Sequence, residues 1–105
     1  MQSHQAIIEE CKAILQQHYG THFAGLYLYG SVARHQEEAS SDIDLLVLLA
    51  KPFDSFKELR EIVDLLYPVQ LKSDQLISAK PVAKSEFEAG KLHFYRTVQQ
   101  EGVAA

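Results

Sequence analysis

The sequence predicts an α/β fold, in which a small mixed β-sheet carries helices packed mainly on one of its faces. Two short apolar runs, residues 23–29 and 42–49, have the length and composition of strands. Stretches with apolar residues at helical spacing precede the first run and follow the second. Because helices that alternate with strands cover a sheet, we expect a layered domain.

The size and charge of the chain limit what it can do. A chain of 105 residues is long enough for one core, so we expect residues 1–105 to form a single domain. The net charge is −4 and no run rich in Lys or Arg is present, which argues against direct binding to nucleic acid. The single cysteine, Cys11, cannot form an internal disulfide, which fits a reducing compartment. No apolar run approaches a membrane span and the N-terminus does not resemble a signal peptide, so we expect a cytoplasmic protein.

The first helix is expected from Ser3 to about Tyr19. Ser3 is a suitable N-cap and Gly20 a suitable stop. Its apolar stripe consists of Ile7, Ile8, Cys11, Ile14, Leu15 and His18. This stripe is expected to cover one face of the sheet.

The first strand, Phe23 to Tyr29, leads into the turn Gly30-Ser31, where a phosphate could approach bare backbone. After a polar loop, the second strand runs from Asp42 to Leu49. Side chains alternate along a strand, so Asp42 and Asp44 are expected on one face, opposite Ile43 and Leu45.

Two carboxylates on one face of a strand suit a hard divalent cation. Mg²⁺, or Mn²⁺ in its place, takes oxygen ligands from one or two carboxylates and from substrate phosphates, which predicts a site for a nucleoside triphosphate at Asp42 and Asp44. There are also plainer interpretations. Ser31 could cap a short helix after an ordinary turn, and both aspartates could face solvent on an edge strand.

The second half of the chain is expected to form two further helical regions around a third strand. A capping-box pattern, Ser55 to Glu58, opens a helix that runs to about Leu66 and ends before Pro68. An extended segment then follows, Val69 to Ser78. A second capping box spans residues 85–88, Gly90 interrupts the helix, and a last helix ends at Gly102.

Two motifs together resemble a known family. Gly30-Ser31, ten further residues and then Asp42-x-Asp44 form a pattern similar to that of the DNA-polymerase-β-like nucleotidyltransferase superfamily. Within it, Gly-Ser-x-Ala-Arg and Ser-Asp-Ile-Asp-Leu-Leu-Val most resemble the minimal nucleotidyltransferases, which are often paired with a HEPN-domain protein. The sequence departs at His35, where the family commonly has Gly.

The resemblance implies roles for individual residues. Gly30 and Ser31 would hold the triphosphate, and Asp42 and Asp44 the metal. Arg34 would reach a phosphate, or would be an ordinary exposed arginine of a helix.

A third carboxylate is also implied, on the third strand. Asp74 would fill this position as a metal ligand and as the base that takes the proton of the acceptor. An alternative alignment places Gln70 there, and a glutamine cannot act as a base.

The implied function is Mg²⁺-dependent transfer of AMP from ATP to a hydroxyl, plausibly a tyrosine of a HEPN-type toxin, with this chain as the antitoxin. A chain this short is expected to assemble with a partner protein or with copies of itself. The alternative is a weak or inactive module of the same fold that neutralises or assembles with its partner by binding alone. Asp74 facing Asp42 and Asp44 would favour the enzyme, whereas Gln70 in that position would favour the binding module.

Overall fold

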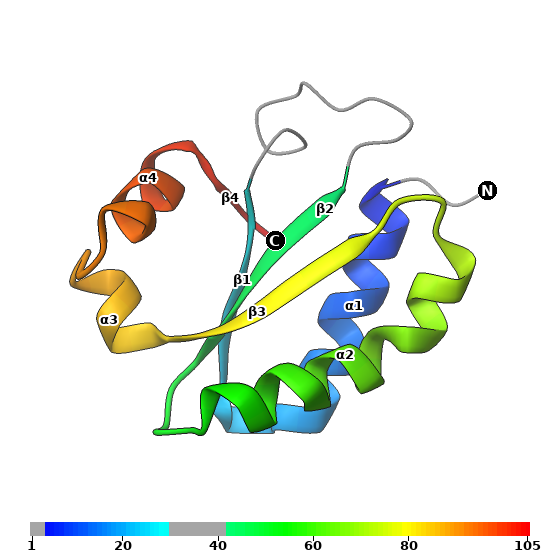
Figure 1. Ribbon diagram of the computed structural model, residues 1–105, viewed down its shortest axis with the longest axis horizontal. Coiled ribbons are helices and arrows are strands. Elements are labelled where there is room, and N and C mark those ends of the chain that lie inside the picture. Colours follow the sequence, from blue (N-terminus) through cyan, green and yellow to red (C-terminus); the bar gives the residue numbers. More distant parts are fainter. Residues whose placement is uncertain (1–3, 30–41) are drawn as a thin grey trace.

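The computed structural model describes residues 4–29 and 42–105. Within these ranges four strands form one sheet in the order β3-β2-β1-β4 (Figure 1). The elements follow along the chain as α1 (His4–Tyr19), the 3-10 turn η1 (Gly20–His22), β1 (Phe23–Tyr29), β2 (Ile43–Leu49), α2 (Ser55–Lys72), β3 (Ile77–Ala83), α3 (Lys84–Glu88), α4 (His93–Glu101) and β4 (Val103–Ala104). Ser3, the predicted cap of the first helix, lies outside the described residues.

The sheet is mixed, as predicted. β1 is antiparallel to β2 and to β4, and β2 is parallel to β3, with α2 as the crossover between them. The first two predicted strands are confirmed, except that β2 begins at Ile43 rather than at Asp42. β3 is an edge strand and contains Pro81.

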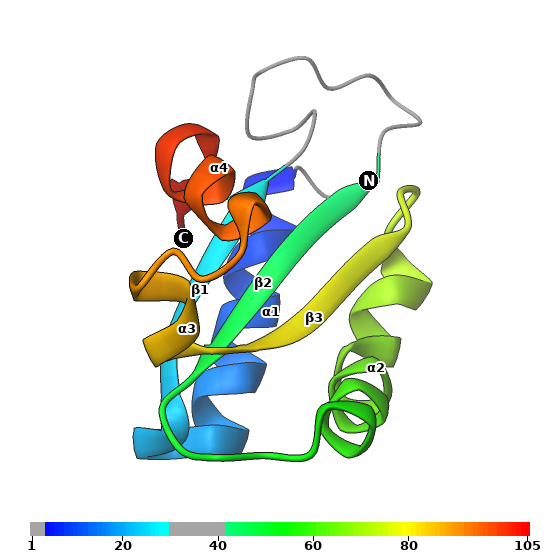
Figure 2. The same ribbon diagram turned by 60° about the vertical axis from the view of Figure 1, so that its left-hand side comes forward.

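One face of the sheet is covered by the two long helices, α1 and α2 (Figure 2). All side chains that β2 turns to this face are at most 1% exposed, namely Ile43, Leu45, Val47 and Leu49. Cys11 of α1 is fully buried among them, and burial together with Glu10 raises the pKa of its thiol to about 11. Cys11 is therefore a core residue, as its place in the apolar stripe predicts.

The opposite face is covered only in part, by the short helices α3 and α4. Leu46 and Leu48 of β2 pack there with Val82, Phe87 and Val98. The helices thus lie mainly on one face, as predicted, and the start of β2 is left with an accessible second face. Within the described ranges, no helix combines the length and hydropathy that a membrane span requires.

The predicted boundary between α2 and β3 is wrong. α2 does not end before Pro68 but continues to Lys72, and β3 occupies Ile77–Ala83 instead of residues 69–78. The buried residues Ile62, Leu66 and Val69 keep the spacing of one helix face past the proline. A proline within a helix costs about 3 kcal/mol, and burial of this face offsets the loss.

The predicted capping boxes are wrong in detail. Asp54, not Ser55, caps α2, and its carboxylate accepts hydrogen bonds from the N–H groups of Phe56 and Lys57 at 3.0 and 3.2 Å. Ser55 is the first helical residue. In α3 the N-cap is Ala83, which has no side chain able to cap, and Ser85 lies within the helix.

The C-terminal segment adds a short strand that the sequence pattern does not predict. α4 ends at Gly102, as expected, and β4 then pairs with Tyr27 and Leu28 of β1. A Cβ atom at residue 102 would lie 2.5 Å from the carbonyl oxygen of Val98. Glycine is therefore required there for the chain to turn back onto the sheet.

Candidate functional site

Asp44 lies at the accessible end of β2. It is half-buried, whereas its neighbours Ile43 and Leu45 are fully buried on the other face. Asp42 precedes the strand and is exposed. In the sheet, Asp44 is flanked by Tyr29 of β1 and by Ser78 of β3. The predicted separation of Asp44 from the apolar face is therefore confirmed.

The charges around Asp44 act on one another. Burial raises the pKa of Asp44, the carboxylate of Asp42 raises it further, and the ammonium group of Lys80 lowers it. Burial and the charge of Asp44 in turn raise the pKa of Tyr29. Two carboxylates that repel each other on an accessible strand end form a donor set that fits one hard divalent cation.

Asp74 is not on the third strand. It lies in the turn between α2 and β3 and is exposed, because α2 continues to residue 72 and β3 starts only at residue 77. Residue 78, paired with Asp44, is a serine. Among the described residues, no three His, Cys, Asp or Glu side chains form a group that could hold a metal ion. The expected strand position of Asp74, beside the Asp pair, is thus wrong.

Gln70 is not beside the Asp pair either, and it has a structural role that sequence reasoning missed. It lies in the last turn of α2, where its Oε1 accepts a hydrogen bond from the N–H of Ile77 at 2.7 Å and its Nε2 donates one to the carbonyl of Gln75 at 3.0 Å. These bonds fix the start of β3 to the end of α2. In the sequence, the signal for this role is a polar residue, Gln70, directly after the apolar positions that end at Val69. We call this pair of hydrogen bonds the Gln70 anchor.

Gly30, Ser31, Arg34 and His35 lie outside the described residues. Their roles at the phosphates therefore stay predictions. The described strands do fix where this segment is joined to the sheet. Tyr29, the last residue of β1, is paired with Asp44, so residues 29 and 42 lie at the same end of the sheet as the carboxylates.

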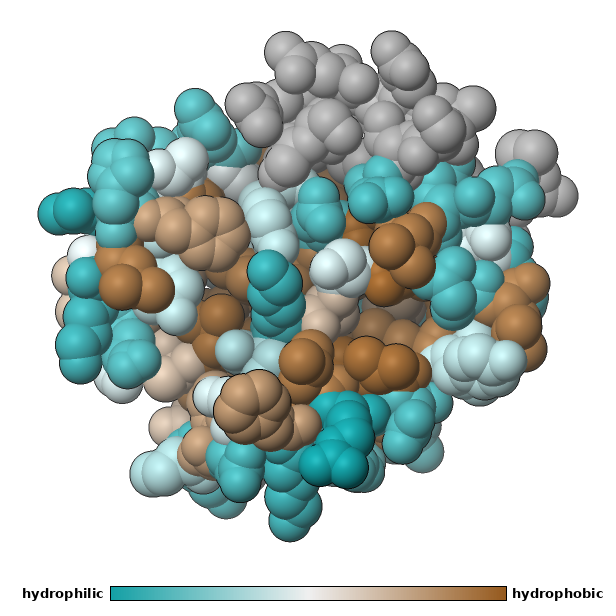
Figure 3. Space-filling model, viewed as in Figure 1, coloured by the Kyte–Doolittle hydropathy of each residue, from teal (hydrophilic) through white to brown (hydrophobic). Residues whose placement is uncertain are grey.

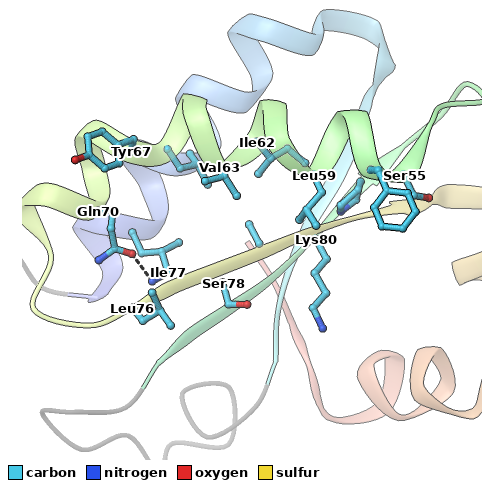
Figure 4. A pocket seen from close by; sticks show the side chains of 14 residues that line it. Ser55, Leu59, Ile62, Val63, Tyr67, Gln70, Leu76, Ile77, Ser78 and Lys80 are labelled. Carbon is cyan, nitrogen blue, oxygen red and sulfur yellow. Dashed lines mark hydrogen bonds between the residues drawn. The ribbon is translucent and has the colours of Figure 1, made fainter.

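An apolar groove of about 570 Å³ lies between α2 and β3. Figure 3 shows hydrophobic surface over these two elements, and Figure 4 shows the groove at close range. Five large apolar side chains that line it are more than a third exposed, namely Phe56, Leu59, Val63, Tyr67 and Leu76. Phe56, Leu59 and Val63 recur at helical spacing with Ile62 and Leu66 along α2, but of these five residues only Ile62 and Leu66 are buried. Residues 77–81 of β3 form one wall of the groove, so the groove adjoins the strand that flanks Asp44.

Comparisons with known proteins place these features in context. The family model described as polymerase beta, nucleotidyltransferase, matches residues 9–99. A crystal structure of a toxin-antitoxin with AMP-PNP has a TM-score of 0.60 and 22% identity, over 91% of this chain and 70% of that chain. A candidate nucleotidyltransferase from Sulfolobus solfataricus has a TM-score of 0.52 and 20% identity, over 94% of this chain and 72% of that chain. At these identities the two structures show the fold alone. No curated protein matches the chain.

Proposed function

This chain belongs to the polymerase β nucleotidyltransferase family, and from this premise we propose that it transfers AMP from ATP to a hydroxyl group of a partner protein. The carrying observation is the pair Asp42 and Asp44 at the accessible end of β2, opposite a fully apolar face. Their mutual repulsion favours a bound cation. Mg²⁺ is the proposed ion, with Mn²⁺ as a substitute.

In the proposed reaction the oxygen of the acceptor hydroxyl attacks the α-phosphorus of ATP. A new O–P bond forms while the bond from the α-phosphorus to the oxygen that bridges to the β-phosphate breaks. The products are the AMP ester of the acceptor, pyrophosphate and the proton of the hydroxyl. Asp42 and Asp44 hold the cation, which when bound neutralises phosphate charge. Gly30, Ser31 and Arg34 are proposed to hold the triphosphate.

The acceptor is proposed to be a tyrosine. No carboxylate stands beside Asp44 on β3 to take a proton, because residue 78 is Ser78 and Asp74 lies in a turn. An acceptor that loses its proton easily is therefore favoured. A phenol, with a pKa of about 10, is a much stronger acid than an aliphatic hydroxyl.

The partner that carries this tyrosine is proposed to be a HEPN-type toxin, with this chain as its antitoxin in the cytoplasm. The groove between α2 and β3 supports a protein partner, since it is apolar and adjoins the strand that flanks Asp44. Contiguous exposed apolar surface of this kind is typical of protein interfaces. The neighbouring structure is a toxin-antitoxin with AMP-PNP, which agrees with both a nucleotide and a protein partner.

A second candidate is a module that neutralises its partner by binding alone. Ser78 in place of a carboxylate favours it, because a serine hydroxyl supplies neither a strong metal ligand nor a base. Both candidates need the groove. They differ in whether AMP is transferred.

The test is incubation of this chain with labelled ATP, Mg²⁺ and the product of the neighbouring gene, followed by mass spectrometry of both proteins. We expect one AMP group on a tyrosine of the partner. Asp44→Asn should lower the transfer rate about a hundredfold or more, because the cation loses a ligand. Asp64→Asn, an exposed aspartate of α2, is the matched control and should transfer normally. Transfer by Asp44→Asn near the wild-type rate would contradict the enzyme.

The binding module gives a different result in the same experiment. No label would be transferred, yet the partner would still bind and be neutralised. Val63→Lys, which places a charge on the exposed apolar surface of α2, should then abolish neutralisation. In the enzyme, the same variant should lower transfer to the partner while AMP-PNP binding is unchanged.

A further inference from the structure

The residue beside Asp44 on β3 determines how many cations this site can hold. β2 and β3 are parallel, and Asp44 is paired with Ser78. Paired residues of neighbouring strands leave the same face, with the strands about 4.8 Å apart. A carboxylate at residue 78 would therefore reach a second cation next to Asp44. The neutral hydroxyl of Ser78 is a much weaker ligand for a hard cation.

Lys80 lies on the same face, two residues further along β3, where it is paired with Leu46. Figure 4 shows the Ser78 hydroxyl and the Lys80 side chain both pointing away from α2, and so toward the face that carries Asp44. Lys80 is exposed, and no ion pair joins it to another side chain in the described ranges. The ammonium group is therefore available to a ligand bound at Asp44.

We propose that the chain binds its nucleotide with one divalent cation, held by Asp42 and Asp44, and that Lys80 supplies further positive charge to the triphosphate. This inference rests on the proposed function. Three carboxylates with two divalent cations would carry a net charge of about +1, and two carboxylates with one divalent cation and a lysine carry the same. With Ser78 beside Asp44, one cation and Lys80 would thus present the phosphates with the same net charge as three carboxylates and two cations.

A purely structural role for Lys80 is the competing explanation. Lysine on an edge strand discourages pairing with the edge of another sheet. That role needs an exposed charge but no particular distance from Asp44. Nucleotide binding therefore separates the two explanations.

The first measurement counts Mn²⁺ ions bound per chain in the presence of saturating AMP-PNP, by electron paramagnetic resonance. Wild type and Ser78→Ala should bind one ion, and Ser78→Asp should bind two. Two ions on the wild type would overturn the inference but leave the proposed function intact. One ion on folded Ser78→Asp would overturn it as well. No bound Mn²⁺ on any of the three proteins would overturn the proposed function itself.

The second measurement is the affinity for AMP-PNP by calorimetry. Lys80→Met should weaken binding about tenfold, as expected for the loss of a charge-assisted hydrogen bond, while Lys80→Arg should bind nearly as well as the wild type. Lys84→Met is the matched control, because Lys84 is an exposed lysine at the start of α3. Unchanged affinity in Lys80→Met, or an equal loss in Lys84→Met, would overturn the role of Lys80.

Discussion

The two faces of β2 differ in what each can tolerate. The face with Ile43, Leu45 and the two residues that alternate with them is sealed by α1 and α2 along the whole strand. The other face is sealed at Leu46 and Leu48 but carries half-buried Asp44 at its start. At the level of Asp44, only the face of β2 that is covered by α1 and α2 is therefore part of the hydrophobic core. A substitution that removes the charge of Asp44 should therefore leave the packing of the core intact. A substitution that shortens the side chain of Leu45, the next residue, should disrupt that packing.

The largest expected effect tests this contrast directly. Leu45 is fully buried, so Leu45→Ala should lower the free energy of unfolding by about 3 kcal/mol through lost burial and an added cavity. Asp44→Asn, in metal-free buffer, should unfold at or above the wild-type urea concentration because it removes a repelling charge. Equal destabilisation by the two variants would mean that Asp44 is a structural residue.

The next effect concerns the hydrogen bonds by which Gln70 holds the start of β3 to the end of α2. Gln70→Ala removes both partners that Gln70 gives to the start of β3 and should cost about 2 kcal/mol in urea unfolding, because the N–H of Ile77 is left unpaired. Gln16→Ala, on the exposed side of α1, is the control and should change stability little. A loss below about 0.5 kcal/mol in Gln70→Ala would mean that water replaces the anchor.

A smaller effect tests the accessible face of β2, through the stability that a cation bound at Asp44 adds to the folded protein. A cation bound only by the folded protein, at ten times its dissociation constant, adds about 1.4 kcal/mol, or roughly 5 to 10 °C in melting temperature. Wild type and Asp64→Asn should both gain this stability from Mn²⁺. Asp44→Asn should gain little. An equal gain in all three proteins would place the stabilising ion elsewhere.

The smallest effect is the pH dependence of stability. Burial and Asp42 raise the pKa of Asp44 above its ordinary value of 3.8 in the folded protein. The folded state therefore holds this proton more tightly than the unfolded state, so ionisation of Asp44 opposes folding. In metal-free urea unfolding, the difference between Asp44→Asn and wild type should grow as pH rises from below 3.8 through the raised pKa, and stay constant above it. A difference that shrinks over this window would contradict the assignment.

Local sequence pattern was sufficient for the elements that position the Asp pair. A local pattern specifies each of α1, β1 and β2: an apolar stripe, an alternation and an apolar run. These elements follow one another in the sequence, and β1 and β2 are also paired in the sheet. The separation of Asp44 from Ile43 and Leu45 follows from the period of a strand alone. The cation at Asp42 and Asp44 remains a prediction. The phosphate contacts of Gly30, Ser31 and Arg34 also remain predictions.

The third strand could not be predicted in the same way, because tertiary packing decides where α2 ends. Pro68 is a local signal to stop, but Val69 continues the buried helix face, and that burial prevails. β3 therefore starts later than the local signals indicate, which places Ser78 beside Asp44 and leaves Asp74 in the turn. Asp54 shows the same limit on a smaller scale, since two adjacent residues were both suitable caps.

Pro81 has a consequence for how other molecules meet this protein. It lies in the edge strand β3, directly after Lys80. A proline has no N–H to offer to an added strand, and a lysine beside it disfavours burial against another sheet. Copies of this chain should therefore resist stacking into extended, aggregating sheets along β3. A protein that docks in the groove between α2 and β3 must therefore recognise the side chains of the groove. The backbone of β3 cannot offer it a full set of hydrogen bonds, because Pro81 lacks an N–H.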